Sequence, residues 1–87
     1  MNKQEDTPIE EAINIGKVLS ERLHKIGVTS LTELKQMGDG QAFMRLMQLY
    51  PDSCYHERLA LAGAVRDIRW HFLSQEIKDD AKKDCAE

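Results

Sequence analysis

Long apolar runs, paired cysteine motifs and a surplus of basic residues are all missing from this sequence of 87 residues. No apolar stretch approaches the roughly 20 residues that span a bilayer, so the sequence does not predict a transmembrane helix. The first residues include no apolar segment typical of a signal peptide, and we expect a cytoplasmic protein. The only two cysteines lie far apart, and no Cys-x-x-Cys or His-x-x-x-His spacing is present, which argues against a zinc site.

Glycine, proline and strand-forming patterns are also scarce. Two prolines and five glycines interrupt the chain, and no run alternates Val, Ile, Thr and aromatic residues as a strand would. Hydrophobic residues make up 41% of the sequence, enough for one core. The sequence therefore predicts a single all-α domain of five or six helices over residues 8–84, with residues 1–7 and 85–87 as tails.

The net charge of −3 is unevenly distributed. Residues 1–15 and 71–87 are acidic, whereas residues 16–70 carry eight basic and six acidic side chains. A domain committed to binding duplex nucleic acid has a much denser basic face. Any nucleic-acid contact is therefore expected to be weak, or to come partly from backbone N–H groups.

Capping residues and helical spacing predict where the helices lie. Thr7-Pro8 suits a short first helix, Gly27 and Gly38 end later ones, and Ser74 caps the last, which is anchored by Ile77 and Ala81. The longest helix is predicted from Asp52 or Ser53 to about Phe72, as a central spine over 53–72. Its buried face is expected to contain these apolar residues: Cys54, Leu61, Val65, Ile68 and Phe72.

Residues 13–34 are typical of a helix-hairpin-helix element. Asn14 can adopt a left-handed conformation, and a turn at Gly16 leaves backbone N–H groups free at a helix start, where an anion such as phosphate binds. The alternative is that Gly16 only makes a turn and Lys17 is solvated, as in most glycine turns between helices. The candidate nucleic-acid contacts are Asn14, Gly16, Lys17, Arg22 and Lys25.

Two further groups are candidates for a partner interface. Arg69 and Trp70 belong to residue types enriched in the energetic centres of interfaces, although a single Trp at a helix end is more often a core residue with its indole N–H at the rim. Met44 and Leu49 would mark a partner or self-association surface if both are exposed. We expect a protein partner or a homodimer through one of these helices.

Enzyme motifs are missing. The side chains of Cys54 and His56, two apart on a helix, point in different directions, and no phosphate-binding loop, nucleophile elbow or dinucleotide fingerprint occurs. Cys85, in a polar tail, is expected to be a free thiol. We therefore expect no enzyme, cofactor, metal ion or small-molecule substrate.

Several of these motifs together resemble the C-terminal domain of TfoX, the bacterial DNA-transformation regulator, over most of the chain. Ala62 and Asp67 stand where the family pattern has Glu and Gly. The matching positions are Asn14-Ile15-Gly16-Lys17, Leu23, Gly27-Val28, Leu31, Leu34, Phe43, Leu46, Cys54, Leu61, Gly63-Ala64 and Ile68-Arg69-Trp70-His71.

The resemblance implies an all-helical fold related to helix-hairpin-helix domains, no known catalytic activity, and a role in competence regulation for the full-length proteins. From it we expect a non-enzymatic regulatory or interaction domain with weak nucleic-acid contact through the hairpin. The alternative is a protein-interaction module or homodimer that binds no nucleic acid.

Overall fold

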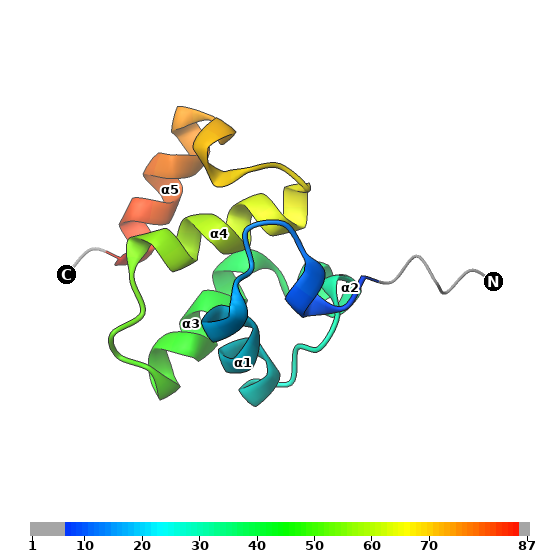
Figure 1. Ribbon diagram of the computed structural model, residues 1–87. Helices are drawn as coiled ribbons and strands as arrows, with labels where there is room; N and C mark the ends of the chain where they lie inside the picture. Colours follow the sequence, from blue (N-terminus) through cyan, green and yellow to red (C-terminus); the bar gives the residue numbers. More distant parts are fainter. Residues whose placement is uncertain (1–6, 86–87) are drawn as a thin grey trace.

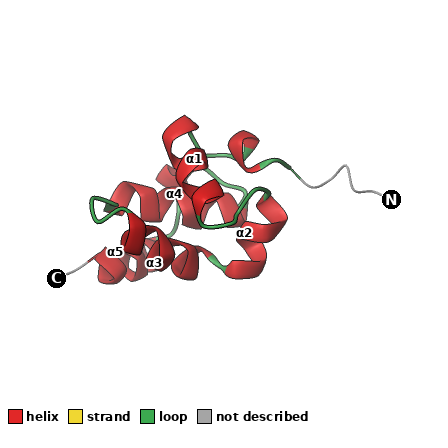
Figure 2. Cartoon of the chain, turned by 90° about the horizontal axis from the view of Figure 1, so that it is seen from below, coloured by secondary structure: helices red, strands yellow, loops and turns green. Residues whose placement is uncertain are grey.

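The computed structural model describes residues 7–85, in which short turns separate five α-helices and two 3-10 helices (Figure 1). Figure 2 shows helices joined by loops over this part of the chain, whose only β pairing is an isolated bridge between Pro8 and Ser30. The predicted all-α fold is confirmed. In chain order the elements are η2 (Ile9–Glu11), α1 (Lys17–Lys25), α2 (Leu31–Met37), α3 (Asp39–Leu49), α4 (Tyr55–Arg66), η3 (Trp70–Phe72) and α5 (Gln75–Cys85).

Local capping sets the start of α2. The Ser30 hydroxyl accepts a hydrogen bond from the backbone N–H of Glu33 at 3.2 Å, and the Glu33 carboxylate accepts one from the backbone N–H of Thr29 at 2.7 Å. This reciprocal arrangement satisfies N–H groups that a helix start leaves without intrahelical partners. The turns before and after α2 contain Gly27 and Gly38 at φ values of 90° and 94°. Gly38 ends this helix, as predicted.

The prediction of one helix over 53–72 is wrong at its C-terminal end. Asp67 adopts a left-handed conformation with φ 62° and ψ 39°. Its N–H donates to Ala64 O, and the N–H of Ile68 donates to Gly63 O at 3.0 Å. These two bonds form a Schellman motif, which ends α4 at Arg66. The chain then turns, so Ile68 and Phe72 are 38% and 77% exposed instead of continuing the buried face.

The prediction that Cys54 is buried is also wrong. Helix α4 begins at Tyr55, so Cys54 is the residue before its first turn and its side chain is exposed. Because a capping residue lies outside the helical repeat, the 3.6-residue spacing does not place it on the buried face. Leu61, which lies inside the helix, is fully buried as predicted.

Helix α4 lies in the middle of the fold and packs against α3 and α5 (Figure 1). Its small residues allow this close approach, because Ala60, Ala62, Gly63 and Ala64 are all buried. One apolar cluster joins α4 to the elements that precede it. A second joins α4 to the C-terminal part of the chain through Leu59, Ala62, Leu73 and Ala81.

A buried ion-pair network connects α3, α4 and α5. The Arg58 guanidinium, with a side chain 9% exposed, contacts Asp39 at 2.6 Å and Asp84 at 2.8 Å. Burial raises the pKa of the Asp39 carboxyl, but the hydrogen bond and positive charge of Arg58 outweigh it, so that this pKa is lower than usual. Arg58 therefore balances the negative charge of one aspartate on α3 and one on α5.

Candidate interaction surface

Asn14 forms the corner between η2 and α1. It adopts the predicted left-handed conformation with φ 73°, and its side-chain N–H donates to Ile68 O at 2.8 Å. Its side-chain oxygen accepts a hydrogen bond from the backbone N–H of Trp70 at 3.3 Å. The amide of Asn14, predicted as a nucleic-acid contact, is therefore bonded to the chain itself, where it holds the loop after α4.

Gly63 makes this contact sterically feasible. A Cβ atom at position 63 would overlap both the Asn14 side-chain nitrogen and the carbonyl oxygen of Ile68. The backbone of α4 can approach Asn14 only because residue 63 has no side chain. The sequence motifs around Asn14 and Trp70 thus form one structural unit.

The first turn of α1 follows this corner and faces solvent. Gly16, Lys17 and Val18 are exposed, no side chain caps the helix start, and the first turn contains no acidic residue. The first backbone N–H groups of an α-helix have no intrahelical acceptor, so they attract a negatively charged group. Gly16 and Lys17, two of the candidate nucleic-acid contacts, therefore lie at an exposed helix start.

Arg22 is engaged within the fold. Its guanidinium contacts Glu57 at 3.1 Å and Asp52 at 3.2 Å, and its Cζ lies 4.4 Å from the centroid of the Tyr50 ring. The side chain is only 17% exposed. Arg22 thus joins α1 to the start of α4, and its charge is paired there.

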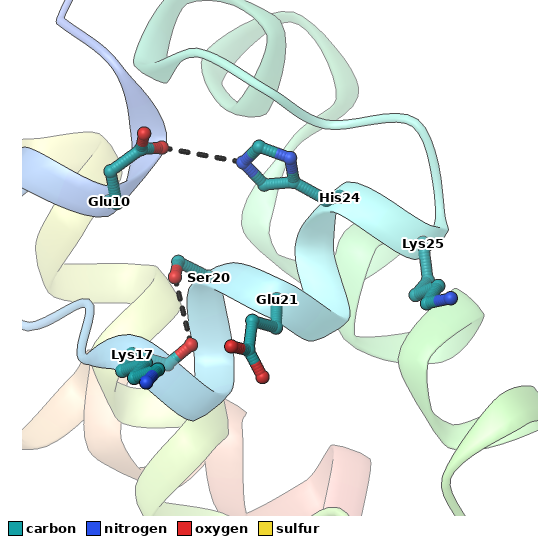
Figure 3. A pocket seen from close by; sticks show the side chains of 6 residues that line it. All are labelled: Glu10, Lys17, Ser20, Glu21, His24 and Lys25. Carbon is teal, nitrogen blue, oxygen red and sulfur yellow. Dashed lines mark hydrogen bonds and ion pairs between the residues drawn. The ribbon is translucent and has the colours of Figure 1, made fainter.

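A shallow cavity of about 430 Å³ runs along α1 (Figure 3). Two interactions shape its wall: His24 Nε2 lies 3.3 Å from Glu10 Oε1, and the Ser20 hydroxyl donates to the Lys17 carbonyl at 2.9 Å. A hydrogen bond from its own backbone N–H and a second from His24 lower the pKa of Glu10. Because both charge signs are present, the cavity is not a basic groove. Its lining residues are Glu10, Lys17, Ser20, Glu21, His24 and Lys25.

Aromatic rings gather around η3, in what we call the ring cluster (Tyr55, His56, Trp70, His71 and Phe72). The Trp70 ring is stacked on His71 with centroids 4.1 Å apart, and it meets His56 edge-on at 5.5 Å. Trp70 is half-buried against the second apolar cluster, consistent with a core residue at the rim, whereas Phe72 is 77% exposed. Arg69 is exposed beside Trp70. The sequence did not indicate Phe72 as an exposed residue, because the predicted helix placed it on a buried face.

Met44 and Leu49 on α3 are 51% and 55% exposed. Residues five apart on an α-helix point in directions that differ by about 140°. Both side chains are therefore exposed, but the spacing does not place them in one patch.

Two sites of other kinds are not found in the part of the chain that the structure describes. Within residues 7–85, no group of three or more His, Cys, Asp and Glu side chains is arranged to hold a metal ion. None of the helices over the same residues is long and apolar enough to cross a membrane.

Comparison with known proteins gives solved relatives of undetermined function. No curated protein matches the chain. An uncharacterized protein from Listeria monocytogenes, solved in a triclinic crystal form, is 42% identical, with a TM-score of 0.86 over 88% of each chain. A protein of unknown function from the same organism, in a tetragonal form, is 43% identical, with a TM-score of 0.83 over 86% of this chain and 93% of its own. Residues 5–85 match the TfoX C-terminal domain, and the chain therefore belongs to that family.

Proposed function

We propose that this chain is a non-enzymatic regulatory domain that acts in the cytoplasm by binding another protein through the surface around η3. The TfoX C-terminal domain is a regulatory type of domain and not a known enzyme family. The resemblance to the DNA-transformation regulator makes competence regulation the process in which we expect it to act.

The exposed ring of Phe72 is the observation that carries this proposal. The Phe72 side chain is 77% exposed, so a partner that covers it would remove apolar surface from water. Such burial favours binding. It stands beside Arg69 and the half-buried Trp70, and these residue types are enriched at interface centres. Asn14, from the N-terminal part of the chain, holds the backbone of this segment through Ile68 and Trp70, so a partner would meet a prearranged surface.

Affinity capture from a bacterial lysate, with and without nuclease, tests the proposal. We expect a partner protein that is retained after nuclease treatment and lost with Phe72→Ser. Leu49→Ser is the matched control, because Leu49 is another exposed apolar residue, on α3. Capture that is equal for the wild type and Phe72→Ser would contradict the role of η3. Light scattering over a range of protein concentrations distinguishes a second copy of this chain from another partner.

Weak nucleic-acid contact through the first turn of α1 is a second candidate function. The uncapped helix start and the exposed Lys17 support it, with Lys25 as a further exposed cation on the same helix. The internal bonds of Asn14 and Arg22 leave fewer contacts for DNA than the sequence predicted.

Fluorescence anisotropy with a labelled DNA duplex at low salt tests this second function. We expect weak binding that decreases as salt rises, because each phosphate contact releases counterions. Lys17→Glu should weaken binding further, whereas Lys35→Glu, an exposed lysine on α2, should have less effect. If no salt-dependent binding is observed, nucleic-acid contact is contradicted and protein interaction is the candidate function that remains.

A further inference from the structure

The two cysteines lie at the same corner of the molecule although they are far apart in sequence. Cys54 immediately precedes α4, and Cys85 ends α5. Figure 1 shows the first turn of α4 beside the last turn of α5. An ion pair confirms this proximity, since Arg58, one turn into α4, donates from Nε to the Oδ2 of Asp84 at 2.8 Å.

The environments of the two thiols differ. Both cysteines are free, but Cys54 is exposed and Cys85 is half-buried against the main apolar cluster. Burial raises the pKa of the Cys85 thiol; Arg58 lowers it, and Asp84 and Cys54 raise it further. Cys54 is therefore accessible to a dissolved oxidant, whereas Cys85 is partly shielded from solvent.

We propose that Cys54 and Cys85 form an oxidant-sensitive dithiol, in which hydrogen peroxide oxidises Cys54 and Cys85 resolves the product to a disulfide. In the first step the Cys54 sulfur attacks the peroxide, the O–O bond breaks, and a sulfenic acid and one water form. In the second step the Cys85 sulfur attacks the sulfenic sulfur, and a second water leaves with the Cys85 proton. The two thiols lose two electrons, which the peroxide gains.

This bond would link the end of α5 to the start of α4. A cross-link reduces the conformational freedom of the unfolded chain, so the oxidised protein should melt at a higher temperature than the reduced protein. In a reducing compartment such a bond is transient and depends on the oxidant present. The proposed function rests on Arg69, Trp70 and Phe72, and none of these residues takes part in the dithiol.

Intact mass measurement of the full chain after treatment with hydrogen peroxide tests the proposal. We expect a monomer about 2 Da lighter than the reduced protein, because one disulfide removes two hydrogens. It should form at a rate independent of protein concentration and revert with dithiothreitol. With Cys85→Ser, oxidation should stop at the sulfenic acid of Cys54 or give dimers.

A variant with the same number of thiols provides the control. Gln75→Cys combined with Cys85→Ser moves the second thiol to the first residue of α5, about 15 Å along the helix from position 85. We expect intramolecular pairing at least tenfold slower than in the wild type. Equal pairing rates in the two proteins would overturn the proposal, as would a wild type that forms only dimers or a sulfinic acid.

Discussion

The start of α2 and the end of α4 are both helix boundaries, but different kinds of interaction determine them. At α2, the side-chain caps join Thr29, Ser30 and Glu33 within five positions of the sequence, and the backbone N–H of Leu31 also donates to Thr7 O. At α4, the left-handed Asp67 is followed by a loop whose backbone is held by Asn14, more than fifty positions earlier. Local capping can be recognised in a sequence, whereas a boundary supported from a distant segment cannot.

Among the variants at these two helix boundaries, we expect Gly63→Ala to cause the largest loss of stability. The added Cβ would overlap Asn14 and the Ile68 carbonyl, so the loop after α4 must move, and overpacking of this kind destabilises by about 3 kcal/mol. Urea unfolding would measure the loss. Gly40→Ala is the control, because a Cβ there meets nothing closer than 3.6 Å; we expect a gain of about 0.5 kcal/mol. Equal behaviour of the two variants would contradict the close approach at Gly63.

Asn14→Ala should destabilise the protein by about 2 kcal/mol, since it removes two hydrogen bonds and places alanine at φ 73°. Asn14→Gly tolerates this φ and loses only the bonds, so we expect a smaller loss. Thermal melts of both variants give the comparison. A glycine variant less stable than the alanine variant would show that the conformation of residue 14 is not a source of strain.

Ser30→Ala should cost about 1 kcal/mol, because it removes an N-cap whose partners are all local. Ser30→Asp, which retains a capping oxygen, should restore most of the stability. Unfolding in urea checks both variants. A loss as large as that of Gly63→Ala would contradict a contribution limited to this side-chain cap.

Asp67→Gly should stabilise the protein by about 0.5 to 1 kcal/mol, because glycine adopts the left-handed conformation without the steric cost that aspartate has. The family pattern has glycine at this position. A shift in the melting temperature measures the gain. Asp52→Gly, at an exposed aspartate outside a left-handed position, should not produce it.

We expect the smallest change in the free energy of unfolding when the pH is lowered. The folded pKa of Asp39 is lower than its unfolded value of about 3.9, so its ionised form contributes stability above about pH 4, and that contribution is lost as the pH falls further. Asp39→Asn should therefore be less stable than the wild type at pH 6, and the difference should narrow at pH 3. Asp80→Asn is an exposed control, which should follow the wild type at both pH values.

The candidate site was predicted in parts but not as a unit. Spacing and turn residues indicated the left-handed Asn14 and the helix starting after Gly16. They gave no indication that the Asn14 amide binds the loop at Trp70, or that Arg22 is paired with Glu57, because both contacts join segments distant in sequence. The glycine of the family pattern at position 67 was the available signal that the long helix ends early.

The helical class, the end of α2 at Gly38 and the cap of α5 at Ser74 could be predicted from the sequence, because they follow from composition and from hydrogen bonds over a few residues. The tertiary structure alone decided that Phe72 and Cys54 are exposed and that Asn14 lies against Gly63. These features depend on how α4 packs against segments from both ends of the chain. Local sequence patterns do not reveal them, because the contacts that place these residues join segments far apart in the chain.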